Sequence, residues 1–332
     1  MDQQSRTEVL DDLTTATWYS VLPDIIDQVF KITPFYDRMT QRNRILSKAP
    51  EGTHWEVPVR YAKLDQNTKW FGRGDSFSKS EKEHLTRLVF YAKNLGTAMV
   101  RYKLDELKNR GKAQLIDYAK EVVETTRLSF QDTLAESLLV QSADPLSIDA
   151  LPTIITSTPT TGSYGGLTRS SNAYLQNQIK DFSGLTTGTD LLDEMTRMYH
   201  ICSEFKGNSG SQRTPDMILT TRAIYQDYER ICRAMQQIVT NTTVRASLGF
   251  GDLMFKNVEM FYDPNCPSGC MYFLNTDTFS MPYDPAAWFT MTEWKQAQDN
   301  LDRVAQVYSV CQLYNDAPQK NGVIFSITAT TD

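Results

Sequence analysis

The sequence predicts an α+β protein of more than one domain, and three observations lead to that class. An alternating apolar pattern indicates strands in the first third of the chain, a long helical pattern covers about 112–141, and short helices and strands follow it. The 332 residues are 40% hydrophobic and 22% charged, the composition of an ordinary folded chain. This length gives a soft prior of roughly two domains and is enough to bury a sizeable core.

Residues 1–47 carry scattered apolar anchors, among them Trp18 and Tyr19, and the anchors are separated by Pro23 and Pro34. Proline interrupts a helix, so the pattern predicts short helices with breaks. Such a segment cannot form a core of its own. We expect it to lie on another surface, as an arm that reaches onto a neighbouring chain would.

A projecting hairpin is predicted over 48–100. The pattern alternates over His54–Tyr61, where Pro58 indicates an edge strand, and Leu85–Val100 is the expected return strand. Two strands joined by so long a loop are marginal alone in water, which suggests that the hairpin grips another chain. The residues that we expect to contact a neighbouring subunit there are Trp70, Phe71, Arg73, Lys79, Glu81, Lys82 and Glu83. A solvated loop explains the charged ones equally well.

The strongest helix signal runs from about residue 112 to 141. Apolar or small residues recur at steps of three, four or seven: Ile116, Ala119, Val123, Phe130, Leu134 and Leu138. These steps describe one buried stripe, and Asp144-Pro145 ends the helix. Some thirty residues at ~1.5 Å each make a rod of roughly 45 Å, which is long for a globular domain.

The chain after this helix is predicted to be mixed. A stretch rich in Ser, Thr and Gly at 145–188 is expected to consist mainly of loops. The elements expected after it are a helix over Asp190–Phe205, a strand over Met217–Leu219, a helix carrying Ile224 to Ile238, and strands over Leu253–Met260, Cys270–Asn275, Val304–Leu313 and Val323–Thr330.

Charge and cysteine content exclude several classes of protein. The net charge of −6 argues against tight nucleic-acid binding over the whole surface, because such binders are usually basic. No apolar run approaches the ~18 residues that span a bilayer. The five cysteines are odd in number and no secretion signal precedes them, so we expect reduced thiols in a protein made in the cytoplasm.

The sequence contains no recognisable catalytic or metal-binding motif. The sequence lacks the GxxxxGK[ST], HExxH and GxSxG patterns. Cys266 and Cys270 are spaced for a turn, but no second pair completes a zinc site. We therefore predict no catalytic residue, no metal and no cofactor. An α/β enzyme without a recognisable motif stays open as an alternative, and it would require a pocket with convergent polar groups.

The order of segments, from arm and long hairpin through long helix to an α/β region, resembles the shell-forming fold of tailed-bacteriophage major capsid proteins, shared with encapsulins and herpesvirus capsids. Local stretches carry the likeness. The sequence GGLTRS at 165–170 followed by YLQN at 174–177 is similar to a "GGIDRS…W-R-N" stretch of one phage capsid group. The sequence PDMILTT at 215–221, the segment from Gly249 to Lys256, and YFLN at 272–275 resemble further stretches of that group. Two departures are Tyr174 in place of tryptophan and Lys256-Asn257 in place of a glycine.

The resemblance implies four parts. These are an N-terminal arm at 1–47, an extended loop at 48–100, a peripheral domain at 101–145 and about 291–318 with the helix 112–141 as its spine, and an axial domain at 146–290 and about 319–332. Asn321-Gly322 alone suggests a two-residue hairpin. The family implies instead that the last strand returns to the axial domain.

The function implied is that of a major capsid protein, a structural subunit of the virion and not an enzyme. It would self-assemble in the host cytoplasm into pentamers and hexamers of an icosahedral shell around double-stranded DNA. The implied partners are other copies of the chain, a separate scaffolding protein and a portal. A decoration protein and weak non-specific DNA contact are left open, and no membrane is implied.

Some relatives cross-link a lysine of the extended loop to an asparagine. The lysines in the corresponding region are Lys63, Lys69, Lys79 and Lys82, and the asparagine would be Asn315. No specific motif matches, so we expect no cross-link. The nearest rival to a phage shell is an encapsulin-like bacterial compartment. Another phage structural protein is a further rival, against which the long helix and the hairpin argue.

Overall fold

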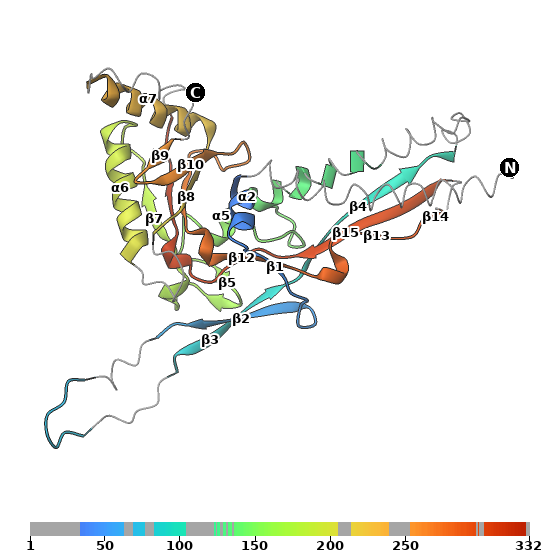
Figure 1. Ribbon diagram of the computed structural model, residues 1–332, viewed down its shortest axis with the longest axis horizontal. Coiled ribbons are helices and arrows are strands. Elements are labelled where there is room, and N and C mark those ends of the chain that lie inside the picture. Colours follow the sequence, from blue (N-terminus) through green and yellow to red (C-terminus); the bar gives the residue numbers. More distant parts are fainter. Residues whose placement is uncertain are drawn as a thin grey trace.

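The structure is a computed structural model, and it describes residues 34–62, 69–76, 83–103, 123, 125–126, 129–130, 132–134, 136–204, 214–238, 253–296, 298 and 302–329. These residues form two large β-sheets, the helices that pack on them and a projecting hairpin (Figure 1). The six-stranded sheet and its two helices lie at one end of the molecule, and the seven-stranded sheet extends away from them. The predicted α+β class is confirmed.

The six-stranded sheet has both faces buried in its centre. Its strands in spatial order are β7 (Gln178–Asp181), β17 (Gly322–Phe325), β11 (Met271–Leu274), β8 (Met217–Thr220), β10 (Val258–Tyr262) and β9 (Met254–Phe255). Every residue of β8 and β11 is buried, because successive side chains point to opposite faces and each face has a cover. Ile218 belongs to one hydrophobic cluster while Met217 and Leu219 belong to the other.

Two amphipathic helices cover one face of this sheet. They are α6 (Thr189–Glu204) and α7 (Arg222–Ile238), and α6 packs on β7, β17 and β11 while α7 packs on β10. The positions that the helical period predicted for α6 are all buried: Leu191, Met195, Met198 and Cys202. In α7, Ile224 and Tyr228 are buried in the same cluster. Both predicted helices are therefore confirmed.

The seven-stranded sheet is organised around its longest strand, β15. Its members are β1 (Ile45–Ser47), β12 (Phe279–Tyr283), β15 (Arg303–Cys311), β13 (Thr290–Met291), β14 (Lys295–Gln296), β4 (Lys93–Arg101) and β16 (Tyr314–Asn315). β4 and β15 pair antiparallel along their whole length, from Arg303 opposite Arg101 to Cys311 opposite Lys93. This ladder forms the long ribbon at the far end of Figure 1.

The predicted long helix packs against this sheet in the part that the structure describes. The described residues from 123 to 139 are helical. The four described members of the predicted stripe are buried: Val123, Phe130, Leu134 and Leu138. The rings of Phe130 and Phe289 lie 5.0 Å apart between centroids, so the helix is anchored on the segment that leads into β13. Residues 104–122, which include Ile116 and Ala119, lie outside the description.

The predicted return strand Leu85–Val100 is wrong as a single strand. The structure divides it into β3 (Leu85–Tyr91) and β4, and the break lies at Ala92. β3 pairs with β2 (His54–Arg60) in a separate two-stranded sheet, whereas β4 joins the seven-stranded sheet. Alternation continues through the break because both halves are half-buried strands, so the pattern could not show the change of partner. Pro58 does lie in an edge strand, as predicted.

The predicted N-terminal arm needs a correction over its last residues. Helix α2 (Pro34–Gln41) buries Phe35, Tyr36 and Met39 in the chain's own core, and β1 adds a strand to the seven-stranded sheet. The rings of Phe35 and Phe279 meet edge to face at 5.2 Å. A helix of eight residues with three buried side chains is therefore part of the fold. Trp18 and Tyr19 lie outside the described residues.

Short elements fill the stretch that was expected to be mainly loops. They are α5 (Leu151–Ile154), β5 (Ser163–Tyr164), β6 (Leu167–Thr168), the 3₁₀ turn η2 (Ala173–Leu175) and β7. The remaining 3₁₀ turns are η3 (Thr276–Thr278), η4 (Pro285–Ala287) and η5 (Pro318–Lys320). Only β7 enters a large sheet, and its alternation is too short to stand out in the sequence.

Of two strand predictions in the C-terminal third of the chain, the first is wrong and the second is confirmed. The single strand over Leu253–Met260 is wrong, because the segment folds back as the hairpin of β9 and β10. The last strand, β17, lies between β7 and β11 in the six-stranded sheet. Asn321-Gly322 is therefore not a two-residue hairpin turn, and Gly322 is instead the first residue of β17.

Candidate assembly surfaces

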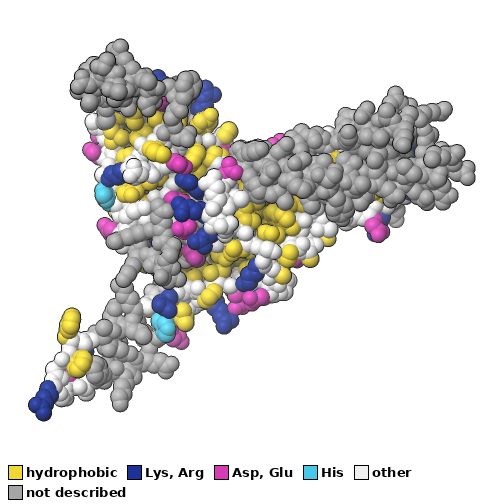
Figure 2. All heavy atoms as spheres, viewed as in Figure 1, with side chains coloured by type: hydrophobic (Ala, Val, Ile, Leu, Met, Phe, Trp, Pro, Cys, Tyr) yellow, Lys and Arg dark blue, Asp and Glu magenta, His cyan; other side chains and the backbone are white. Residues whose placement is uncertain are grey.

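The tip of the β2–β3 hairpin exposes large aromatic side chains. Trp70 is 102% exposed and Phe71 is 65% exposed, at the end of the hairpin that projects furthest from the two sheets (Figures 1 and 2). Gly74 has φ +93° and the backbone N–H of Gly72 donates to Asp75 Oδ2 at 2.7 Å, so a local turn shapes the tip. Full exposure of a tryptophan forgoes the large gain that burial of its ring would bring.

Aromatic packing fixes the root of the hairpin. The ring of Phe90 stacks on Tyr314 at 5.0 Å and meets Tyr164 edge to face at 5.2 Å. The Tyr164 hydroxyl donates to the carbonyl of Asn315 at 3.0 Å and accepts from its N–H at 2.7 Å. These contacts join β3 to β5 and β16, so the direction in which the hairpin leaves the body is set by buried groups.

The glycine pair of the GGLTRS stretch forms the other support of the root. Gly165 has φ +56° and Gly166 has φ +82°, which are conformations that glycine adopts without strain. A Cβ on Gly165 would lie 2.8 Å from the Cβ of Leu88 in β3. The carbonyl of Gly165 accepts from the N–H of Val89 at 3.1 Å. The motif therefore brings the β5–β6 turn into direct contact with the hairpin.

The polar residues of the same stretch hold loops together. Arg169 is buried, and its guanidinium donates to the carbonyls of Thr153 at 2.9 Å and Ile154 at 3.0 Å. Burial lowers the pKa of this arginine. Asn177 pairs with Thr156 through both of its amide atoms, accepting at 3.1 Å and donating at 2.9 Å. Both side chains therefore hold neighbouring loops of the chain together.

Only some of the residues predicted to contact a neighbouring subunit lie in the part of the chain that the structure describes. Arg73 and Glu83 are exposed on the hairpin, like Trp70 and Phe71. The structure thus brings Trp70, Phe71 and Arg73 together at one tip. Lys79, Glu81 and Lys82 lie outside the described residues, as do Trp18 and Tyr19.

Sequence reasoning missed several exposed apolar residues on the body. The most exposed are Leu146 (72%), Met254 (55%), Tyr102 (55%) and Tyr262 (50%). Each stands at the end of a strand or in a loop, where the apolar pattern gives no sign of which side faces solvent. Only the packing of neighbouring elements decides their exposure.

The cysteines offer little for metal binding or nucleophilic chemistry. Cys266 is buried, and burial raises the pKa of both the Cys266 and the Cys270 thiol, which disfavours the thiolate that such chemistry requires. Among the residues that the structure describes, no group of three or more His, Cys, Asp or Glu is placed to hold a metal ion. No helix in the described part of the chain is long and apolar enough to cross a membrane.

The asparagine considered for a cross-link is fully engaged inside the fold. Asn315 is buried, its amide donates to Thr278 Oγ1 at 3.0 Å, and its Oδ1 accepts from the N–H of Ala317 at 2.8 Å. A lysine of a neighbouring copy would have to displace these bonds to reach it. That Asn315 forms no cross-link stays a prediction.

No protein-family model and no curated protein matches the sequence. Solved structures do match. The cyanophage A-1(L) capsid has a TM-score of 0.59 at 16% identity, over 86% of this chain and 90% of that chain. The capsid of a native GTA particle has a TM-score of 0.58 at 8% identity, over 87% and 90%. The SrpI encapsulin complex from Synechococcus elongatus PCC 7942 has a TM-score of 0.56 at 11% identity, over 90% of both chains.

These matches extend over most of the chain on both sides, and they agree with the order of elements described above. Identities this low establish architecture and no more. The chain has the shell-forming fold found in tailed-phage capsid proteins and encapsulins.

Proposed function

We propose that this protein is the major capsid protein of a tailed bacteriophage, a structural subunit that assembles with copies of itself into an icosahedral shell. The single observation that carries the proposal is the projecting hairpin on a shell-forming fold, with a tryptophan at its tip that is 102% exposed. A monomer gains nothing from holding that side chain in water, whereas a neighbouring copy can bury it.

The geometry favours contacts between unlike surfaces. The tip projects away from the two sheets in Figure 1, so it can reach a surface on another copy that differs from the tip itself. Contacts of this head-to-tail kind close into rings when the rotation between copies allows. Rings of five and six are the units that an icosahedral shell requires, and we infer that the chain forms pentamers and hexamers.

The contact residues follow from this proposal. Trp70 and Phe71 serve as apolar anchors, and Arg73 and Glu83 serve as charged partners around them. The other residues assigned to inter-subunit contact are Trp18, Tyr19, Lys79, Glu81 and Lys82. Aromatic and arginine side chains contribute most to typical interfaces, so the first three at the tip should dominate.

The two sheets take separate roles in the proposal. The six-stranded sheet with α6 and α7 is the core of the axial domain, which meets its copies around the symmetry axes. The seven-stranded sheet and the long helix form the peripheral domain, and β2–β3 is the extended loop. We assign the boundary after the hairpin to Ala92, since β4 belongs to the larger sheet.

Further partners complete the proposal. A separate scaffolding protein and a portal would direct assembly in the host cytoplasm, and the mature shell would enclose double-stranded DNA. With a net charge of −6, contact with that DNA would be weak and non-specific. The role is structural, and we assign no catalytic activity.

Electron microscopy of the purified recombinant chain tests the proposal, with its mass in solution measured alongside. Closed shells, or rings of five and six subunits, are the expected result. A chain that stays monomeric at high concentration, even when co-expressed with the products of neighbouring genes, would rule out a shell subunit.

A second measurement separates the phage shell from the encapsulin-like alternative, because both use this fold. Particles isolated from the natural source should contain a portal and packaged DNA if the phage assignment is right. Particles that lack both and hold a cargo protein bound through a short peptide would assign the chain to a bacterial compartment.

Substitution at the tip tests the proposed anchors. Trp70→Ala should leave the unassembled chain folded, since the side chain makes no buried contact within it, and should reduce assembly strongly. Trp70→Phe is the matched control, and it should retain most of the assembly because it keeps an aromatic ring. Equal assembly of the alanine variant and the wild type would remove Trp70 from the interface.

A further inference from the structure

Two cysteines lie at the ends of a tight turn between β10 and β11. They are Cys266 and Cys270, in the sequence CPSGC at 266–270. The N–H of Cys270 donates to the carbonyl of Pro267 at 3.3 Å, and Gly269 lies inside the turn at φ +70°. A left-handed glycine at the third position fits a type II turn, which reverses the chain over four residues. The turn therefore brings the two cysteines back toward one another.

Both cysteines pack in the same apolar cluster. Cys266 is a buried member of it, and the half-buried Cys270 packs against it. Tyr272 of β11 belongs to the same cluster, and its hydroxyl is hydrogen-bonded to the Cys270 thiol. Burial and, after it, the neighbouring Cys270 and Cys266 thiols raise the pKa of Tyr272. The two sulfur atoms thus converge on one tyrosine side chain.

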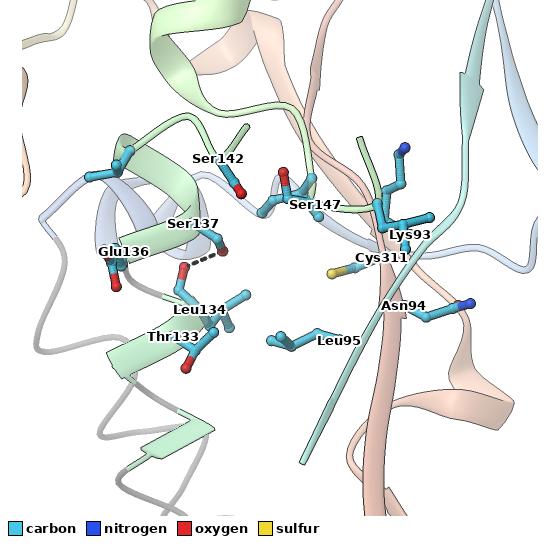
Figure 3. Close-up of a pocket in the computed structure, with 13 residues that line it drawn as sticks. Lys93, Asn94, Leu95, Thr133, Leu134, Glu136, Ser137, Ser142, Ser147 and Cys311 are labelled. Carbon is cyan, nitrogen blue, oxygen red and sulfur yellow. Dashed lines mark hydrogen bonds between the residues drawn. The ribbon is translucent and has the colours of Figure 1, made fainter. Parts of the chain in front are cut away.

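The other three cysteines lie elsewhere in the fold. Cys202 and Cys232 belong to the cluster beneath α6 and α7, on the opposite face of the six-stranded sheet. Cys311 in β15 lines an open groove of about 330 Å³ at the end of the long helix, together with Leu95 and Leu134 (Figure 3). Among the described residues that line this groove, Cys311 is the only cysteine. The turn therefore holds the one pair of cysteines that the fold brings together.

We propose that Cys266 and Cys270 form a reversible disulfide that locks this turn when the protein meets an oxidising small-molecule disulfide such as oxidised glutathione. The thiolate of Cys270, the less buried of the two, attacks one glutathione sulfur, and the S–S bond breaks to release one glutathione thiolate. The Cys266 thiolate then attacks the Cys270 sulfur of the mixed disulfide and releases the second glutathione. Two cysteine thiols are oxidised, one glutathione disulfide is reduced, and the two cysteine protons end on the glutathione sulfurs.

The lock would act on neighbouring segments, because the turn is bonded to them. The N–H of Ile327, just after β17, donates to the carbonyl of Gly269 at 3.0 Å, and Thr220 Oγ1, at the end of β8, donates to the carbonyl of Cys270 at 3.0 Å. A disulfide across the turn restricts the local opening that breaks these bonds. Within the proposed function, the lock closes once a particle leaves the reducing host cytoplasm. The bond itself belongs to the single chain, so its test does not depend on assembly.

Mass spectrometry of the full-length chain tests the bond. Trypsin releases both cysteines in one peptide, 257–295, which contains no other cysteine. Burial raises the pKa of both thiols and makes the exchange slow, so the folded chain is incubated for hours with oxidised glutathione, then blocked with iodoacetamide and digested. The expected peptide carries no alkyl group and is about 2 Da lighter than its reduced form. Alkylation at both cysteines, glutathione retained on Cys270, or a bond to another cysteine would overturn the inference.

Amide hydrogen exchange gives an independent readout of the lock. Exchange at the N–H of Ile327 should be at least about threefold slower in the oxidised chain than in the reduced chain. Cys266→Ser cannot close the bond and should show no such difference. Cys232→Ser removes a half-buried cysteine of α7 and is the matched control, which should respond like the wild type. Equal exchange in the oxidised and reduced wild type would show that the turn is not locked. A response that persists in Cys266→Ser would come from another thiol and would contradict the assignment.

Discussion

Asp216 and Thr276 are joined by two hydrogen bonds across the interior of the molecule. Asp216 Oδ1 accepts from the N–H of Thr276 at 2.7 Å, and Oδ2 accepts from its hydroxyl at 2.5 Å. Asp216 immediately precedes β8, and Thr276 begins the turn after β11. Arg42 approaches the same carboxylate at 3.4 Å, and Arg38 bridges to Glu259 at 2.7 Å. The acidic residue of the PDMILTT stretch thus joins α2 to the six-stranded sheet.

Removal of this carboxylate should destabilise the fold strongly. Asp216→Ala removes the buried acceptor of the Thr276 N–H and hydroxyl together with the carboxylate that Arg42 approaches, and we expect a loss of about 3–5 kcal/mol in the free energy of unfolding. Urea unfolding of the unassembled chain measures it. Asp193→Ala, on the exposed side of α6, should change the value by less than about 0.5 kcal/mol. If both variants lose a comparable free energy of unfolding, the contacts of Asp216 make no specific contribution to stability.

Gly165 should not tolerate a side chain. Its φ of +56° strains any L-residue, and a Cβ would also lie 2.8 Å from Leu88 Cβ. Gly166 has φ +82° and open space around it, so Gly166→Ala carries the backbone strain alone, about 1–2 kcal/mol. Gly165→Ala should lower the free energy of unfolding by measurably more than Gly166→Ala does. Leu88→Ala shortens the clashing side chain but keeps its Cβ, so in a double-mutant cycle it should relieve only part of the extra loss caused by Gly165→Ala. If the losses of the two single variants simply add in the double variant, the contact between Gly165 and Leu88 is contradicted.

The turn between β9 and β10 is expected to improve with glycine. Lys256 and Asn257 have φ values of +48° and +64°, the left-handed pair that a two-residue hairpin turn requires. Asn257→Gly should therefore raise the free energy of unfolding by about 0.5–1 kcal/mol. Lys256→Gly should gain less, because it removes an ammonium 5.3 Å from the Tyr199 ring. A loss of stability in Asn257→Gly would show that the asparagine side chain is required.

The same turn illustrates what the sequence could and could not reveal. The replacement of a family glycine by Lys256-Asn257 was visible, yet without coordinates it gave no reason to expect a hairpin there. Helices α6 and α7 were predicted correctly, because apolar residues repeated with the helical period over four turns fit few structures other than an amphipathic helix. The break at Ala92 and the packing of α2 were not predicted, because both depend on which distant strand or core a short segment meets.

The sequence predicted only one part of the candidate contact surface, the exposed hairpin tip. The aromatic pair at 70–71 stands in a polar loop, so its exposure could be expected from the sequence. The groove at the helix end could not, because its walls come from segments as distant as Leu95, Ile148 and Cys311. The roles of Arg169 and Asn177 were equally hidden, since both bond to backbone groups that only the folded loops bring near.

Asp316 should make stability depend on pH in mildly acidic solution. Its crowded surroundings raise the pKa of this carboxyl to about 6, with desolvation outweighing the attraction of Lys320 and Arg44. The folded state then binds its proton more tightly than the unfolded state, so this group destabilises the fold progressively as the pH rises from about 4 to about 6. Because the side chain keeps an exposed face, we expect only about 1 kcal/mol.

Asp316→Asn tests this dependence. Above pH 6 the variant should be the more stable chain, by up to the same ~1 kcal/mol, and near pH 4 the two should converge. Urea unfolding at a series of pH values measures the difference. A variant that is less stable than the wild type above pH 6 would show that the attraction of Lys320 and Arg44 for the carboxylate outweighs its desolvation.

The aromatic contacts at its root should fix the direction of the hairpin. Phe90 stacks on Tyr314 at 5.0 Å, and Phe90→Leu keeps an apolar side chain while losing the ring contacts, at a cost of about 0.5–1.5 kcal/mol. The loss falls on the root of β2–β3, so amide hydrogen exchange in these two strands should accelerate by up to about tenfold. Phe182→Leu, in the core beneath α6, is the matched control and should leave exchange in the hairpin unchanged. If both variants accelerate hairpin exchange equally, the hairpin opens only with global unfolding. If only Phe90→Leu does so and its assembly also falls, the buried root sets the direction in which the tip is presented to a neighbour.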